Sequence, residues 1–224
     1  MTHETKDTHW AVILGASAGT GAAVAREVAH RPGLHVFGVH RGHHPEGADA
    51  VVLDVQAAGR RAVLRVGEAG TYESAVDGTS ELLAAAGPRS VRLFVHSIAN
   101  ASLGRMVSND DAQFSAAQFH KTFDSMAHSF VYWVQQLVAR DLLAPEAQLL
   151  GLSNPLVDSL VRNGGLITAT KAALEVYVRH LAWELGPRGH RVNLLKFGAV
   201  VTPAMNQTFS GEAGDELQRV LPRV

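Results

Sequence analysis

The stretch that decides the fold is Gly15-Ala-Ser-Ala-Gly19-Thr-Gly21, which directly follows the apolar run Ala11–Leu14. Glycines at these positions let the backbone turn tightly and approach a pyrophosphate without a Cβ in the way. A helix that begins here presents free N–H groups and the positive end of its dipole to the phosphates. The pattern therefore predicts a strand, a nucleotide-binding turn and a helix. The expected binding residues in this turn are Gly15, Ser17, Ala18, Gly19 and Gly21.

Outward from this turn, short apolar runs alternate with longer segments of helical periodicity. The runs lack the alternation of half-exposed strands, which is typical of parallel strands buried on both faces. The expected strands are Ala11–Leu14, Leu34–Val39, Ala62–Val66, Val91–His96, Gln148–Leu152 and Arg191–Leu195. The expected helices lie near 20–31, 47–58, 71–86, 112–143 and 165–186. With no repeat or linker, residues 1–224 are predicted to form a single Rossmann-type α/β domain with a doubly wound parallel sheet.

The end of the second expected strand indicates which dinucleotide is bound. An acidic residue there would bind the ribose 2′-hydroxyl of NAD, whereas a basic residue suits the 2′-phosphate of NADP. The chain has Arg41 at this place, 20 positions after Gly21 (41 − 21), and no acid at the strand tip. This favours NADP(H) over NAD(H).

Composition excludes several classes of protein. The net charge of −1 with 18% charged residues offers no electrostatic footprint for nucleic acid. The chain has no cysteine, and the polar N-terminus resembles no secretory signal. No apolar stretch is long enough for a membrane helix, so we expect a soluble cytoplasmic protein. Twelve histidines are present, but none has HExxH spacing; His43 and His44 are interpreted as solvated, and no metal site is expected.

Several motifs resemble the short-chain dehydrogenase/reductase family over nearly the whole chain. The glycine spacing G-x3-G-x-G is similar to that of the family, and Thr168-Ala-Thr-Lys171-Ala-Ala-Leu-Glu175 resembles its lysine helix. The fourth strand end, Val-His96-Ser97-Ile98-Ala99, and Ser129-Phe130-Val131 resemble the enoyl-acyl-carrier-protein reductase branch. Arg65 stands where the family has Asp or Asn beside the adenine, and Phe197 replaces the proline of its Pro-Gly-x3-Thr turn. The resemblance implies further cofactor contacts from Val66, Ser97, Ile98, Ala99, Lys171, Gly198, Val200 and Thr202.

The expected catalytic centre departs from the family. Most members have a tyrosine four residues before the lysine, which is Ile167 here (171 − 4); enoyl reductases have it seven before, which is Gly164 (171 − 7). That hydroxyl normally stabilises the oxyanion formed on hydride transfer. The resemblance keeps Lys171 as the ribose contact. The candidate catalytic residues are Lys171, Ser153 and Asn154, with His96 and His128 as further donors in reach.

These observations leave three functions open. The leading hypothesis is an NADPH-dependent reductase of a conjugated enone or enoyl thioester. The first alternative is a divergent ketoreductase whose substrate supplies the proton, and the second is a cofactor-binding pseudoenzyme. The expected partner is a small-molecule or acyl-carrier-linked substrate, with no nucleic acid and no membrane. The resemblance also implies a homodimer or homotetramer through the helices at 112–143 and 165–186. The family normally continues with a helix and a seventh strand, so either that strand is absent or the sequence is truncated.

Overall fold

The computed structural model describes residues 9–110, 113–158, 160, 162–198, 200 and 202. The strands are β1 (Trp10–Leu14), β2 (His35–His40), β3 (Ala62–Val66), β4 (Val91–His96), β5 (Leu143–Ser153) and β6 (Arg191–Lys196). The longer helices are α1 (Gly19–His30), α2 (Pro45–Ala57), α3 (Tyr72–Ala86), α4 (Ala116–Phe123), α5 (Ser129–Ala139) and α6 (Gly165–Leu185). Shorter helical segments are the π-helix η1 (Asp124–His128) and the 3₁₀ turns η2 (Pro155–Asp158) and η3 (Gly186–Arg188). The residues after Thr202, where the family resemblance implies a further helix and a seventh strand, lie outside the described residues.

The strands form one parallel sheet in the order β3-β2-β1-β4-β5-β6. The predicted Rossmann-type α/β fold is therefore confirmed. The strand order reverses between β1 and β4. The connection that leaves β1 therefore runs to one side of the sheet and the connection that leaves β4 runs to the other, which opens a crevice at the carboxyl ends of these two strands. This crevice is where a doubly wound sheet binds its ligand.

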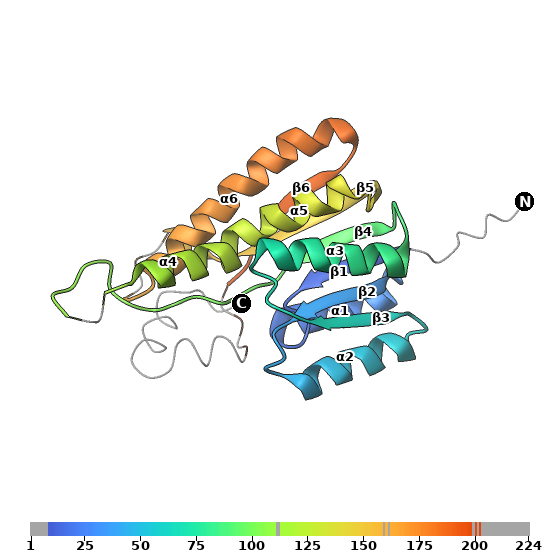
Figure 1. The fold of residues 1–224 in the computed structure, drawn as a ribbon, viewed down its shortest axis with the longest axis horizontal. Coiled ribbons are helices and arrows are strands. Elements are labelled where there is room, and N and C mark those ends of the chain that lie inside the picture. Colours follow the sequence, from blue (N-terminus) through green and yellow to red (C-terminus); the bar gives the residue numbers. More distant parts are fainter. Residues whose placement is uncertain are drawn as a thin grey trace, which may run out of the picture.

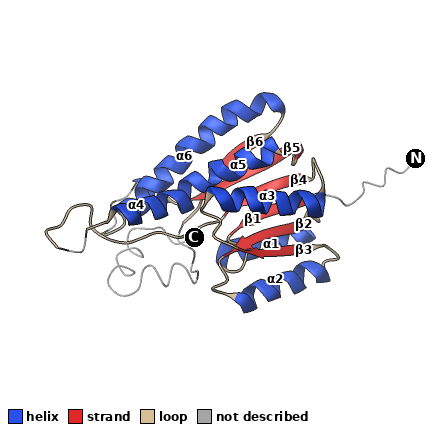
Figure 2. Cartoon of the chain, in the orientation of Figure 1, coloured by secondary structure: helices blue, strands red, loops and turns tan. Residues whose placement is uncertain are grey.

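Helices cover both faces of the sheet (Figure 1). The strand residues alternate between two apolar cores, one on each face. Trp10, Val12 and Leu14 of β1 pack in the core shared with α3, α5 and α6. Ala11 and Ile13 pack in the core shared with α1 and α2. Figure 2 shows the sheet enclosed between these helices. Burial on both faces explains why the strands are apolar throughout.

The predicted helix at 112–143 is wrong at both ends. Ser115 and Gln118 form a capping box, so the helix begins at Ala116. The helical segment then continues through η1 and α5 and ends at Ala139. The apolar pair at 142–143 fits a helical period, but Leu143 already begins β5, which is longer than predicted. The register between β4 and β5 shifts from Val91↔Leu143 to Leu93↔Gln148, so an irregularity containing a proline separates the two pairings.

Among the described residues, no helix combines the length and the apolar character needed to cross a membrane.

Candidate functional site

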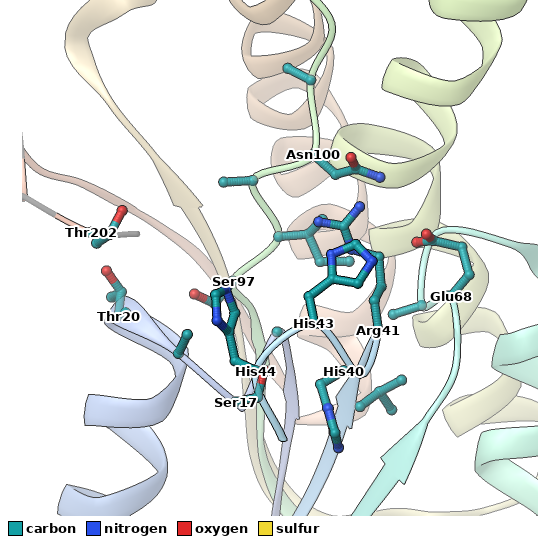
Figure 3. A pocket seen from close by; sticks show the side chains of 18 of the residues that line it. Ser17, Thr20, His40, Arg41, His43, His44, Glu68, Ser97, Asn100 and Thr202 are labelled. Atoms are coloured by element: carbon teal, nitrogen blue, oxygen red, sulfur yellow. The ribbon is translucent and has the colours of Figure 1, made fainter. Parts of the chain in front are cut away.

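A cleft of about 950 Å³ opens at the carboxyl edge of the sheet, over β1, β2, β3 and β4. Its walls come from the turn after β1, the loop after β2, the turn after β3, the segment after β4 and the α4 helix. Figure 3 shows Thr20 and Thr202 at one end of this cleft and Glu68 at the other, with His43 and Arg41 between them. The cleft thus follows the sheet edge, as an extended ligand requires.

The glycine-rich turn fits a phosphate group. Gly15 has a φ of +85°, and a Cβ on it would collide with the carbonyl oxygen of Ser97 at the end of β4. A Cβ on Gly21 would collide with the carbonyl oxygen of Gly15. The N-terminus of α1 has no side-chain cap at Ala18 and no acidic residue in its first turn. Its N–H groups therefore face the cleft without a competing anion, and the residues present fit the pyrophosphate of a dinucleotide.

The segments after β4 and β6 reach the same turn. Ser97, Ile98 and Ala99 line the cleft directly after β4, as predicted. Thr202 also lines it, and a Cβ on Gly19 would lie only 3.1 Å from the Thr202 methyl carbon. The absence of a side chain on Gly19 therefore lets Thr202 lie directly over the start of α1.

The loop after β2 carries Arg41 into the cleft, together with His43 and His44. A Cβ on Gly47 would collide with the carbonyl oxygen of Ser17, so the start of α2 packs directly against the glycine-rich turn. This close approach holds the loop beside the expected phosphate position. Both histidines are exposed, as expected, and yet they contribute to the wall of the cleft.

Arg65 and Val66 at the end of β3 are not among the residues that line the cleft. The Arg65 guanidinium pairs with Glu81 at 3.2 Å and Asp77 at 3.7 Å on α3, and donates a hydrogen bond to Ser74 at 3.2 Å. Val66 is 65% exposed and is not among the residues that line the cleft. Its predicted cofactor contact has no support from this arrangement and stays a prediction.

Lys171 lies on α6, buried beneath the end of β5. Its Nζ donates a hydrogen bond to the carbonyl oxygen of Leu152 at 2.7 Å, and burial lowers its pKa to about 8. Ile167, one turn earlier, is also buried, and Gly164 precedes the first turn of the helix. Neither tyrosine position therefore brings a hydroxyl to the lysine.

Ser153 and Asn154 stand at the end of β5. The Ser153 hydroxyl is buried and donates a hydrogen bond to Glu175 on α6 at 3.2 Å. The Glu175 carboxylate also forms an ion pair with the Lys196 ammonium at 3.1 Å, and this contact raises the pKa of Lys196. The Ser153 hydroxyl is thus bonded to α6, and Asn154 follows it directly at the strand end.

Both candidate histidines are held in contacts within the protein. The fully buried His96 bonds through Nε2 to the Ser129 hydroxyl at 2.8 Å, and burial lowers its pKa to about 3, so it is neutral. The Ser129 hydroxyl donates to the Ser125 carbonyl at 2.8 Å, which makes His96 the donor to Ser129. His128, in the π-helix η1, bonds through Nδ1 to the Tyr177 hydroxyl at 3.1 Å. Neither histidine lines the cleft.

Of the remaining predicted contacts, Lys171, Ser153, Asn154, Gly21, Gly198 and Val200 are not among the cleft-lining residues. Sequence reasoning missed Glu68, Asn100 and Lys121 as well as His43 and His44 of the loop after β2, all of which line the cleft. Most of these residues follow a strand on its carboxyl side, which is a usable signal. Lys121 had no such signal, because α4 reaches the cleft only through tertiary packing. Within the described residues, no group of three or more histidine and acidic side chains is arranged to bind a metal ion.

Comparison with known proteins agrees with this architecture. Residues 15–222 match the family model described as enoyl-(acyl carrier protein) reductase. An uncharacterized oxidoreductase of Methylorubrum extorquens is 30% identical over 93% of this chain and 79% of its own length. The NADH-dependent enoyl-[acyl-carrier-protein] reductase of Haemophilus influenzae is 34% identical, over only 50% of this chain and 42% of its own. A short-chain dehydrogenase from Burkholderia cenocepacia, solved with NADP, superimposes with a TM-score of 0.78 at 24% identity, over 96% of this chain and 89% of that one.

The chain belongs to the short-chain dehydrogenase/reductase family, whose members are NAD(P)-dependent oxidoreductases of small molecules. The predicted family is thereby confirmed. Family membership does not identify the substrate that is reduced.

Proposed function

We propose that this chain is an NADPH-dependent reductase of a conjugated enone or enoyl thioester with an atypical active site. The observation that carries the proposal is the Ser97–Ala99 segment, which lines the cleft against the glycine-rich turn. This is the segment whose sequence resembles the enoyl reductase branch, and the matching family model carries the same description. The half-length match to an enoyl reductase adds support.

Arg41 supports NADPH as the preferred dinucleotide. It lies in the cleft at the end of β2, and no acidic residue at this strand tip opposes a phosphate. Arg41→Ala should raise the Kd for NADPH about tenfold to a hundredfold, since a charge-assisted hydrogen bond contributes about 1.5–3 kcal/mol. The Kd for NADH should change little. Arg31→Ala, on an exposed side chain outside the cleft, is the matched control; equal weakening of both dinucleotides would contradict the preference.

The bound dinucleotide would supply the hydride, and the residues of this chain would hold and orient it. The N–H groups at the start of α1, with Ser17 and Thr20, would bind the phosphates. The family resemblance assigns the nicotinamide ribose to Lys171, whose pKa of about 8 leaves it mostly protonated at neutral pH. Lys171 does not line the cleft, and its Nζ is bonded to the Leu152 carbonyl, so it would reach the ribose only with a donor that this bond leaves over. Gly198, Val200 and Thr202 would enclose the nicotinamide, as the family resemblance implies.

Asn154, which follows the end of β5, is the proposed oxyanion donor, because the family resemblance places an active-site hydroxyl at this position. An amide N–H stabilises a negative oxygen by hydrogen bonding but does not transfer a proton at neutral pH. Reduction of an enone needs only such a hydrogen bond, since the enolate oxygen stays bonded to the amide while water protonates the carbon. Reduction of a ketone needs a proton on oxygen itself. The absence of a hydroxyl at positions 164 and 167 therefore favours reduction of a carbon–carbon double bond.

A cofactor-binding pseudoenzyme is the second candidate. One observation favours it: the Lys171 ammonium is fully buried and bonded to a main-chain carbonyl, with the aliphatic Ile167 where the family has its acid. Such a protein would bind NADPH and transfer no hydride.

Stopped-flow oxidation of NADPH distinguishes the candidates. Enones and enoyl thioesters should consume NADPH, and simple ketones should not. Turnover of ketones alone, especially of phenolic ketones that carry their own acid, would favour the divergent ketoreductase. Tight binding of NADPH without turnover of any carbonyl compound would favour the pseudoenzyme.

A further inference from the structure

The turn that follows β3 is fixed in place from two sides. Trp133 of α5 donates its indole N–H to the carbonyl oxygen of Ala69 at 3.0 Å. Gly70 packs so closely on the π-helix η1 that a Cβ would lie 2.9 Å from the Cα of Ser125. Neither contact tolerates a shift of the turn by much. The residue that this turn carries into the cleft, Glu68, therefore has a well-defined backbone position.

The Glu68 carboxylate is oriented within that turn and directed at the cleft. Its Oε1 accepts a hydrogen bond from the Gly70 N–H at 3.2 Å, and Figure 3 shows the side chain at the cleft wall. Across the described part of the chain, Glu68 makes no ion pair, although Arg41 faces the same cleft. The carboxylate thus keeps acceptor capacity for a ligand.

The order of the sheet places a nucleobase in front of Glu68. The phosphate-binding turn follows β1, and Arg41, beside the adenosine ribose, follows β2. The next strand in the sheet is β3. A dinucleotide laid along this edge therefore has its adenine past the ribose, at the carboxyl ends of β2 and β3. Arg65 is directed to α3 instead, where its guanidinium bonds Glu81 and Ser74.

We propose that Glu68 selects adenine by accepting a hydrogen bond from its exocyclic amino group. This rests on the proposed dinucleotide binding and adds the residue that recognises the base. A carboxylate has only acceptors, so it pairs with the N6–H of adenine and repels the carbonyl oxygen that hypoxanthine carries at the same position. A glutamine at position 68 has both kinds of atom, because its amide can rotate to donate to that oxygen.

The experiment compares binding of NADPH with that of its hypoxanthine analogue, in which only the amino group is replaced. Isothermal titration calorimetry on the parent, Glu68→Ala, Glu68→Gln and the exposed control Glu27→Gln gives each pair of Kd values. The parent and the control should bind NADPH at least about tenfold more tightly than the analogue, as a hydrogen bond to a charged group predicts for an exposed carboxylate. In Glu68→Ala the ratio should fall to within about twofold. In Glu68→Gln the ratio should also fall, mainly because the hypoxanthine analogue binds this variant more tightly than it binds the parent.

Four outcomes would overturn the inference. Equal binding of the two dinucleotides by the parent would do so, as would an unchanged ratio in Glu68→Ala. NADH is titrated as well, and a change in the NADPH-to-NADH ratio of Glu68→Ala with an unchanged base ratio would place Glu68 on the ribose instead. A parent that binds neither dinucleotide would overturn the proposed function together with this inference, whereas the other results leave that function standing.

Discussion

Replacing Lys171 with methionine should change how the stability of the protein depends on pH. The ammonium is fully buried and has one main-chain hydrogen bond, to Leu152 at 2.7 Å, and burial lowers its pKa from 10.5 to about 8. Methionine has a similar length and no charge, so it fills the same space without the cost of burying a cation.

The sign and size of the effect follow from proton linkage. Between pH 8 and 10.5 the unfolded chain holds the Lys171 proton and the folded chain has lost it. The unfolded state therefore binds more protons, and the free energy of unfolding rises with pH across this window. The shift is about 2.5 units (10.5 − 8), and each unit corresponds to about 1.4 kcal/mol. Lys171 should thus destabilise the parent by about 3 kcal/mol below pH 8, and this cost should vanish above 10.5.

Urea unfolding of the parent and Lys171→Met, followed by circular dichroism at several pH values, measures the free-energy cost of burying the Lys171 ammonium. The difference between the two unfolding free energies should move by about 3 kcal/mol in favour of the parent as pH rises from about 7.5 to 10.5. Groups that titrate in both proteins, such as Lys196 and Tyr132, cancel in the difference. Lys121→Met, on an exposed side chain of α4, should show no such movement. A pH-independent difference for Lys171→Met would refute the reasoning.

Three other results are expected. Gly21→Ala should abolish dinucleotide binding in calorimetry, because the new Cβ would collide with the Gly15 carbonyl. The control Gly186→Ala, whose Cβ would enter open space, should bind like the parent. Parent-like binding by Gly21→Ala would contradict this prediction. Asn154→Ala should lower kcat about 10²–10³-fold and Ser153→Ala less than tenfold, since the Ser153 hydroxyl is engaged by a carboxylate on α6; the reverse order would make the serine the oxyanion donor. Light scattering at neutral pH should show at least a homodimer, formed through α5 and α6, and a dilute monomer would refute that interface.

Much of the architecture could be predicted from local pattern. The apolar runs and helical periods placed each strand and most helices, because burial on both faces of a parallel sheet leaves a direct mark on composition. The glycine-rich turn indicated the phosphate site because its backbone conformation and close contacts exclude side chains, as Gly15 and Gly21 demonstrate. Arg41 could be placed for a similar reason: a strand tip lies at the carboxyl edge whatever the rest of the chain does.

The direction of side chains beyond the strand ends was decided only by tertiary structure. The Arg65 guanidinium forms ion pairs with acidic residues on α3, whereas Glu68, three residues later, lines the cleft. Ser153 turns to Glu175, a partner 22 residues away in sequence. Helix periodicity placed residues 142–143 in a helix, but the strand pairing of Leu143 with Val91 prevailed. Local sequence determines which element forms and where it ends, whereas a side chain's partner depends on elements distant in sequence, whose charges and packing meet it only when the chain is folded.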